Sequence, residues 1–301
     1  MNIQMNIKEF TEKARVEIAE TLGKEVQVNK VDKLNGVKLH GLTISEPDGN
    51  VATTLYLEQF YDMYLDSGNW PEIMDKIITA YQSNRFPKHL DVEWFKDFDK
   101  VQGLIFHKLV NYEASTALLE KIPYTRYLDF AIVYCVHYDS AETGSCSILI
   151  HNSHLEAWHC TVQNLVRIAE ENTPRLFPLK VSTMSEVLQD CMGDMGDCPV
   201  SEKAISAVPM YVMSNEPREN GAVTICYKDS LKNFAQKLDS DVVILPSSVH
   251  EVILLPLKDN TDFDELKDMV HHVNRTQLDR EEFLSDNIYL YRRNTDNVEI
   301  V

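Results

Sequence analysis

The sequence contains no apolar run of about 18 residues, the length that a helix needs to cross a membrane. Its densest apolar stretch, residues 242–257, is interrupted by prolines, serines, a histidine and a glutamate. The opening segment, MNIQMNIKEF, lacks the apolar centre of a secretory signal, and the cysteines do not have the spacing of a disulfide framework. We therefore expect a cytoplasmic protein that does not enter a membrane.

Basic residues are scarce. The chain of 301 residues has 29 Lys and Arg against 47 Asp and Glu, which gives a formal net charge of −18 at pH 7. Such a charge repels the phosphate backbone, so we expect no direct binding to nucleic acid. One hypothesis that uses the charge is an acidic decoy, which would occupy the nucleic-acid-binding surface of a partner protein.

Several signatures of common enzymes are also missing. The sequence has no G-x-G-x-x-G, no G-x-x-x-x-G-K-[ST], no H-E-x-x-H and no G-x-S-x-G motif. These absences remove the most frequent dinucleotide, P-loop, zinc-protease and hydrolase interpretations. We expect no cofactor, and a binding protein is favoured over an enzyme.

What the sequence does contain is a succession of strand pairs and amphipathic helices. The segment 128–138, LDFAIVYCVHY, is nearly continuous in apolar and β-prone residues, which is typical of a central strand buried on both faces. A single helix is predicted from Ser153 to about residue 170, and a strand is predicted over 222–227. Because the strands come in hairpin-like pairs, the pattern predicts an α+β fold with mostly antiparallel or mixed sheets flanked by amphipathic helices.

The length suggests two domains. A break at Pro123 places the expected boundary between an N-terminal α+β region at 1–125 and a C-terminal α+β region at 126–301, unless the two form one continuous domain. The first helix is expected to end at Gly23, and a helix with Thr183 and Glu186 at its start is expected next to an aperiodic loop at 193–204.

Two groups of side chains have the chemistry of metal ligands. They are His151, His154, His159 and Cys160 near the start of the predicted helix, and Cys191 with Cys198 further on. His154 and His159 are too far apart in sequence to share one helix face, and Cys-x6-Cys lacks the short spacing of a structural zinc site. We expect no metal at either place.

A polar insertion lies between two apolar strands, at Ser247, Ser248, His250 and Glu251. Serine, histidine and a carboxylate are the ingredients of nucleophilic catalysis, which makes an uncatalogued hydrolase the alternative to a binding protein. Neighbouring strand residues point to opposite faces, however, so His250 and Glu251 cannot both face one serine unless the loop bends. Pro-Ser-Ser is also ordinary turn chemistry, and a structural role is the favoured interpretation.

The candidate ligand-binding residues are Asn274, Arg275 and Arg292, of which Arg275 and Arg292 could form an anion site. Arginine makes bidentate contacts with carboxylates and phosphates, although an arginine at the end of a helix also complements the helix dipole. Asn274 and Arg275 are expected to be partners for Glu251. The ligand would be a small molecule, and an unknown protein partner is the alternative.

Several phrases of the sequence together carry a resemblance to a known family. They are Thr54–Glu58 (TLYLE), Leu128–Val133 (LDFAIV), Asn172–Leu176 (NTPRL), Tyr211–Asn215 (YVMSN), Ile244–Glu251 (ILPSSVHE) and Val273–Thr276 (VNRT). From about Phe10 to Asn294 the chain resembles a domain-of-unknown-function family of cytosolic proteins common in anaerobic Gram-positive bacteria. It is also distantly similar to the YtpQ-like bacterial family. The resemblance implies no activity or catalytic residue, and a non-catalytic cytoplasmic binding or accessory protein remains the main hypothesis.

Overall fold

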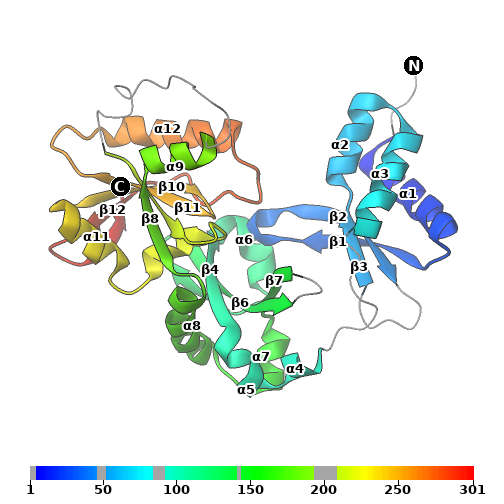
Figure 1. The fold of residues 1–301 in the computed structure, drawn as a ribbon, viewed down its shortest axis with the longest axis horizontal. Coiled ribbons are helices and arrows are strands. Elements are labelled where there is room, and N and C mark those ends of the chain that lie inside the picture. Colours follow the sequence, from blue (N-terminus) through cyan, green and yellow to red (C-terminus); the bar gives the residue numbers. More distant parts are fainter. Residues whose placement is uncertain (1–4, 46–51, 84–91, 141–143, 193–208) are drawn as a thin grey trace.

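The computed structural model describes residues 5–45, 52–83, 92–140, 144–192 and 209–301 of the chain (Figure 1). These residues form helices and three β-sheets, which confirms the α+β fold. All the strand pairings in the described ranges are antiparallel. The expected loop at 193–204 lies outside the described residues.

The N-terminal module is a three-stranded sheet covered by helices. Its elements are α1 (Ile7–Leu22), β1 (Val26–Asp32), the short 3-10 turn η1 (Leu34–Gly36), β2 (Lys38–Ser45), β3 (Ala52–Tyr56), α2 (Glu58–Ser67) and α3 (Trp70–Ser83). Helix α1 ends as expected at Gly23, which has a left-handed φ of 62°. The module has its own core, in which Phe10, Leu42, Ile44 and Ile77 are buried.

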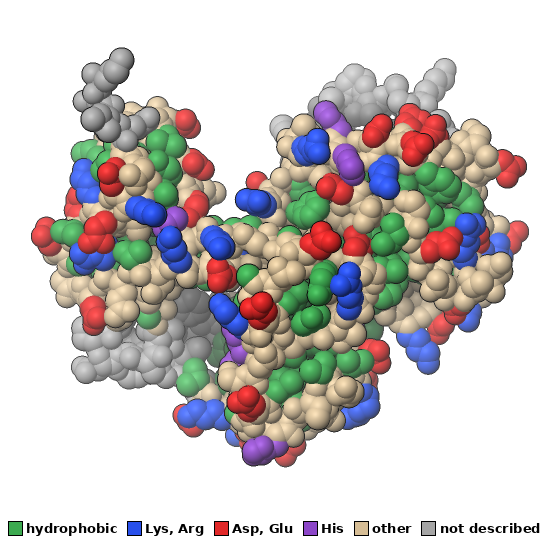
Figure 2. All heavy atoms as spheres, turned by 180° about the vertical axis from the view of Figure 1, so that it is seen from behind, with side chains coloured by type: hydrophobic (Ala, Val, Ile, Leu, Met, Phe, Trp, Pro, Cys, Tyr) green, Lys and Arg blue, Asp and Glu red, His purple; other side chains and the backbone are tan. Residues whose placement is uncertain are grey.

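The module meets the rest of the chain at the tip of its β1–β2 hairpin, which reaches α6 (Tyr112–Leu119; Figure 1). Asn35 at this tip is only 3% exposed. Its side-chain amide donates to the carbonyl oxygens of Glu281 (2.8 Å) and Phe283 (2.7 Å), and its backbone N–H donates to the Ser115 hydroxyl (2.9 Å). The space-filling view shows the surface hollowed between the module and the remaining chain (Figure 2). The hairpin tip is therefore the anchor of the module.

The middle of the chain forms a second sheet around a long strand, β6 (Phe130–Ser140), as expected for the central strand. The other elements are α4 (Glu93–Lys96), α5 (Phe98–Val101), η2 (Gln102–Leu104), β4 (Ile105–Asn111), α6, β5 (Tyr124–Tyr127), β7 (Gly144–Leu149), α7 (Asn152–Trp158) and α8 (Val162–Leu176). Strand β4 pairs with one edge of β6, whereas β5 and β7 share the other edge. The expected domain boundary after residue 125 falls inside β5, so a division there would cut this sheet.

The single helix predicted from Ser153 was wrong, because the chain forms two helices there. His159 adopts a left-handed φ of 51° and ends α7. Thr161 then caps α8, with its hydroxyl accepting from the backbone N–H of Asn164 at 3.3 Å. The break lets Trp158 and Leu165 pack into one core with Tyr134 of β6.

The C-terminal part is a six-stranded sheet in the order β13-β12-β10-β11-β9-β8. Its elements are β8 (Leu179–Thr183), α9 (Met184–Met192), β9 (Tyr211–Asn215), η3 (Gly221–Cys226), α11 (Ser230–Leu238), β10 (Val242–Ser248), β11 (Glu251–Pro256), α12 (Phe263–Thr276), β12 (Tyr289–Arg292) and β13 (Asn297–Ile300). Helix α9 begins as expected with a box in which Thr183 and Glu186 cap each other.

The strand predicted over 222–227 was wrong, because these residues form the 3-10 helix η3. The Thr224 hydroxyl donates to the carbonyl of Gly221 at 2.7 Å, and the Ser230 hydroxyl donates to the carbonyl of Thr224 at 2.8 Å. These bonds satisfy the carbonyl groups of Gly221 and Thr224, which in a strand would accept from the N–H groups of a neighbouring strand. The apolar residues Ala222, Val223 and Ile225 are buried in the C-terminal core all the same.

Strand β4 connects the cores of the middle and C-terminal parts. Ile105 packs with the helices α7 and α8, Val110 packs with α6, and Leu109 packs with the C-terminal sheet. His107, on the same face as Leu109, is 4% exposed, and its Nε2 has no hydrogen-bond partner among the described residues. Burial lowers the pKa of His107 from 6.5 to about 4, so the imidazole is neutral in the folded protein.

Replacing Gly36 by alanine is expected to open the hairpin anchor. Gly36 and Gly68 both have left-handed φ angles, 67° and 63°, so alanine is strained at either position by about 1–2 kcal/mol. Only at Gly36 would the new Cβ meet another element, at 2.7 Å from the Ala114 carbonyl oxygen. Hydrogen exchange at residues 33–37 and 281–284 should become faster in Gly36→Ala and stay unchanged in Gly68→Ala. Equal exchange in the two variants would contradict the anchor.

His107 is expected to make the folded state sensitive to acid. Its pKa is about 4 in the folded protein against an ordinary value of 6.5, so below pH 6.5 the unfolded chain binds a proton that the folded chain rejects. The contribution of His107 to the free energy of unfolding is complete above pH 6.5. It falls by about 1.4 kcal/mol per pH unit down to pH 4. Denaturant unfolding from pH 7 to 4 should show a shallower pH slope in His107→Gln than in the wild type, and identical slopes would refute the assignment.

Candidate functional site

The four candidate catalytic residues, Ser247, Ser248, His250 and Glu251, lie where β10 turns into β11. The strand register shifts between Pro246 and Ser248, so Ser247 lies in an irregular part of β10. The Ser248 hydroxyl accepts from the backbone N–H of His250 at 3.0 Å and is largely buried. This hydrogen bond is ordinary turn chemistry, in which the serine side chain supports the backbone.

The imidazole of His250 is hydrogen-bonded to the residue before η3. Its Nδ1 accepts from the backbone N–H of Asn220 at 3.2 Å, so the neutral ring carries its proton on Nε2, which is 3.7 Å from a carboxylate oxygen of Glu282. In the part of the chain that the structure describes, no hydrogen bond joins this ring to a serine hydroxyl. The arrangement ties η3 to the turn.

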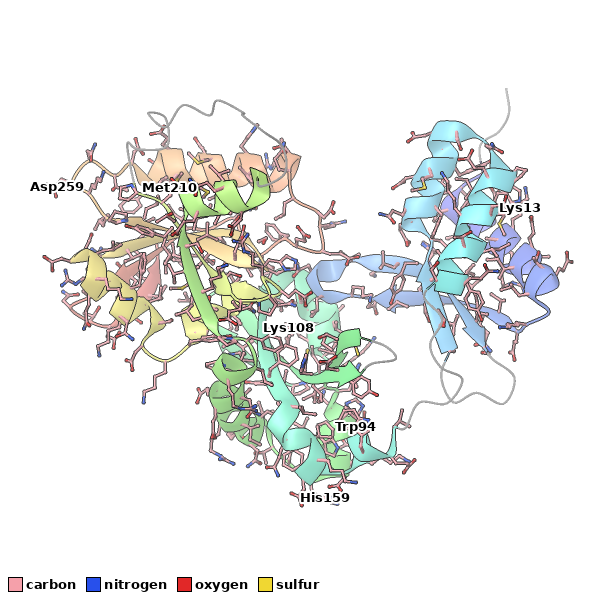
Figure 3. The ribbon with its side chains drawn as sticks, in the orientation of Figure 1. Lys13, Trp94, Lys108, His159, Met210 and Asp259 are labelled. Carbon is pink, nitrogen blue, oxygen red and sulfur yellow. The ribbon has the colours of Figure 1, made fainter. Side chains whose placement is uncertain are left out.

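A polar pocket adjoins this turn at Asn220. We call it the Lys108 pocket; its volume is about 250 Å³, and it lies between the middle sheet and the C-terminal part. The residues that line it are Phe106, Lys108, His137, Ser145, Cys146, Ser147, Phe177, Glu219 and Asn220. Figure 3 shows Lys108 on β4, near the centre of the molecule.

The strand register explains why these polar side chains meet. His137 of β6 lies opposite Ser147 of β7, and Val133 of β6 lies opposite Lys108 of β4. Val133 and His137 are four positions apart on β6, so their side chains point to the same face. Residues two apart along a strand point to one face, so the lysine, the histidine and the serines gather on one side of the sheet. The other residues of β4 are all buried, and Lys108 is the single partly exposed position of that strand.

The ammonium group of Lys108 uses one of its hydrogen-bond donors within the described residues. Its ammonium donates to the Ser147 hydroxyl at 2.9 Å and lies 5.5 Å from the centre of the Phe106 ring. Among the described residues, no carboxylate lies within 4.0 Å of it. An ammonium group has three donors, and the Ser147 hydroxyl accepts only one of them.

His137 is held in place by aromatic rings. Its ring centre lies 6.4 Å from that of Phe106 and 5.3 Å from that of Phe177, both in edge-to-face geometry, and the two phenylalanines lie 4.8 Å apart. Within the described ranges its ring nitrogens make no hydrogen bond to the protein. The exposed Glu219 brings one carboxylate to the pocket. An ammonium, an imidazole and hydroxyls on one face suit a bound anion.

Asn274 and Arg275 lie elsewhere, at the end of α12 beside the hairpin anchor. They line a cavity of about 530 Å³ together with Asn35, Gly36, Ala114, Leu278, Asp279, Arg280, Phe283 and Asp286. Asn274 donates to the carbonyl of Ser285 and to Asp286, both at 2.9 Å, so its amide serves the loop after α12 and not Glu251. Arg275 and Arg280 are exposed, and Asp279 and Asp286 lie in the same lining.

Arg292 does not line that cavity. It lies on β12, where its Nε donates to Glu299 at 2.7 Å and a terminal nitrogen is 3.5 Å from Asp241. Its guanidinium is therefore already engaged by two carboxylates. The structure brings Asn274 and Arg275 together and leaves Arg292 apart from them.

The histidines and thiols considered as metal ligands do not form a metal site among the described residues, where no group of three such side chains has suitable geometry. His154 Nδ1 accepts from the backbone N–H of His151 at 3.1 Å, and burial lowers the pKa of His154. Burial raises the pKa of the Cys160 thiol. Cys198 and the side chain of Cys191 lie outside the described residues.

Lys108 and His137 were missed by the sequence reasoning. The available signal was a lysine inside the strand IFHKLVN and a histidine late in the strand LDFAIVYCVHY. Each is a polar residue at a position that the surrounding pattern would bury, and a buried charge needs a partner.

His250→Ala is expected to destabilise the turn without removing a reactive group. It leaves the Asn220 N–H without its acceptor, which costs about 0.5–1.5 kcal/mol. In His250→Asn the side-chain oxygen can replace Nδ1, so most of the loss should be recovered. Denaturant titration of the three proteins measures the difference, and equal stability of wild type and His250→Ala would show that the bond does not matter.

The comparisons with known proteins identify the family. The model of a family of unknown function, DUF5688, matches residues 7–293, and the chain belongs to this family. The search of curated proteins and the search of solved structures each returned no match. Separately, none of the helices in the described ranges combines the length and the apolar character needed to cross a bilayer. The match includes strands of all three sheets, with only β13 beyond its end, and the family description assigns no ligand.

Proposed function

We propose that this DUF5688 protein is a non-catalytic cytoplasmic binding protein, and that its ligand is a small molecule with a carboxylate or phosphate group. The ligand would bind in the Lys108 pocket with its anionic group on the ammonium of Lys108. His137, Ser145 and Ser147 would supply further hydrogen bonds.

The observation that carries this proposal is the state of Lys108. Strand β4 is otherwise buried, and its one lysine has a neutral hydroxyl at 2.9 Å as its polar contact. This contact is exposed to solvent, so a ligand anion can reach the ammonium group. Hydrogen bonds between charged partners are the strong ones.

The size and position of the pocket support a small ligand. Its volume of about 250 Å³ is below the roughly 300–1,000 Å³ that is typical of sites for drug-sized molecules. The walls come from the middle sheet, from Phe177 after α8 and from Glu219 and Asn220 before η3, and junctions between parts of a chain are frequent binding places. The Phe106 and Phe177 rings would pack against the apolar part of the ligand.

The alternative is a hydrolase, and one contact favours it. The Ser147 hydroxyl is within 2.9 Å of the Lys108 amine, which is the distance between a nucleophile and its base. In that reaction Lys108 must be neutral, whereas in our proposal it is charged. Ser247 and Ser248 lack such a contact with His250, so the hydrolase suggested by the sequence would use Ser147 in their place.

Binding is expected to depend on the charge of Lys108. Isothermal titration with inorganic phosphate, pyrophosphate and malate should show binding of at least one of them to the wild type. Lys108→Met removes a charged hydrogen-bond donor worth about 1.5–3 kcal/mol, so affinity should fall by about 10- to 150-fold. Lys30→Met, which changes an exposed strand lysine of the N-terminal module, is the matched control.

The outcome distinguishes the two functions. Equal affinity in Lys108→Met and wild type, or no binding of any probe, would count against the binding proposal. Hydrolysis of p-nitrophenyl acetate that is lost in both Ser147→Ala and Lys108→Met, and kept in Lys30→Met, would establish the hydrolase.

A further inference from the structure

Strand β8 forms an edge of the six-stranded sheet. One side of β8 pairs with β9, and no other strand of the described residues pairs with its outer side (Figure 1). Leu179 and Val181 on this strand are 39% and 38% exposed. Proteins usually protect an edge of this kind with charges, prolines or a covering element, because it can pair with another chain.

A groove runs along β8 on the side of α11. Its volume is about 670 Å³ and its surface is mostly apolar. Leu179 and Val181 form one wall, Phe234 and Leu238 of α11 form the other, and Tyr211 and Tyr227 complete the lining. The Tyr227 hydroxyl donates to the carbonyl of Phe177 at 2.9 Å, so its polar end is satisfied. The groove therefore offers apolar contact next to a free strand edge.

The charged residues of the groove favour an acidic partner. Lys228 and Lys237 line it, and neither has a carboxylate within 4.0 Å in the described part of the chain. The one acidic side chain of the lining, Glu186, already accepts from the backbone N–H and the hydroxyl of Thr183 at 2.7 and 3.0 Å. Among the described residues, the groove therefore presents two lysine ammonium groups and no free carboxylate, which complements acidic residues of a partner.

We propose that this groove docks an extended segment of another protein, which adds a strand to the outer edge of β8. Apolar residues at alternate positions of the segment would contact Leu179, Val181 and Phe234, because alternate residues of a strand face one side. Acidic residues of the segment would face Lys228 and Lys237. A second copy of the chain fits less well, because two β8 edges would bring these lysines and Lys180 together. The proposal does not depend on the Lys108 pocket.

The test begins with selection from a library of random dodecapeptides displayed on phage, with the wild-type protein as bait. Peptides that also bind Val181→Asp are removed. The enriched peptides should alternate apolar residues and carry Asp or Glu. No enrichment, or enrichment of basic or helically spaced peptides, would overturn the proposal.

Fluorescence anisotropy with one enriched peptide then tests the geometry. Val181→Asp should weaken binding at least tenfold, whereas Val28→Asp, at an equally exposed valine (39%) on another edge strand, should not. Lys237→Glu should weaken binding of the acidic peptide and improve binding of its lysine-substituted form. N-methylation of alternate peptide amides should abolish binding in one of the two registers, since strand addition needs those N–H groups.

Two results would overturn the docking of a foreign strand. One is equal binding by the wild type and Val181→Asp. The other is a dimer in sedimentation velocity that disappears in Val181→Asp, because the groove would then be occupied by a second copy.

Discussion

The burial of strand β4 is the constraint on which the rest of the structure depends. Its residues contribute to the core under α7 and α8, to the core under α6 and to the core of the C-terminal sheet. A strand in this position has little room for polar groups. Lys108 and His107 therefore stand out, one opening into a polar pocket and the other kept neutral by burial. At this pocket the side chain of Lys108 makes a hydrogen bond, whereas the other side chains of β4 are buried.

Buried polar contacts fix how the parts of the chain meet. Asn35 bonds the hairpin tip to Ser115 and to the carbonyls of Glu281 and Phe283. At the start of β6, the carboxylate of Asp129 accepts from Ser285 and Tyr289 at 2.6 Å and from Asn287 at 3.0 Å. Each such group is costly if it loses its partner, so these bonds select one arrangement of the parts. The Lys108 pocket is formed by that arrangement.

Local signals predicted much of the fold, and contacts between distant segments explain what they missed. The central strand, the end of α1 at Gly23 and the Thr183–Glu186 box follow from residues close in sequence. The break at His159 and the 3-10 helix at 221–226 depend on packing against other elements. The pocket needs the register of three strands together with Phe177 and Asn220, which no local pattern contains. The serines near His250 were visible in the sequence, but only the structure shows that the backbone N–H of Asn220 donates to Nδ1 of the His250 ring.

The central claim is that the ammonium of Lys108 is the anion-binding group of the protein. The most direct measurement is an anomalous difference map from crystals soaked in millimolar tungstate, a tetrahedral analogue of phosphate that scatters strongly. The account predicts the strongest peak within hydrogen-bond distance of Lys108 Nζ, beside His137 and Ser147. A strongest peak at Arg275 and Arg280, with none at Lys108, would contradict it.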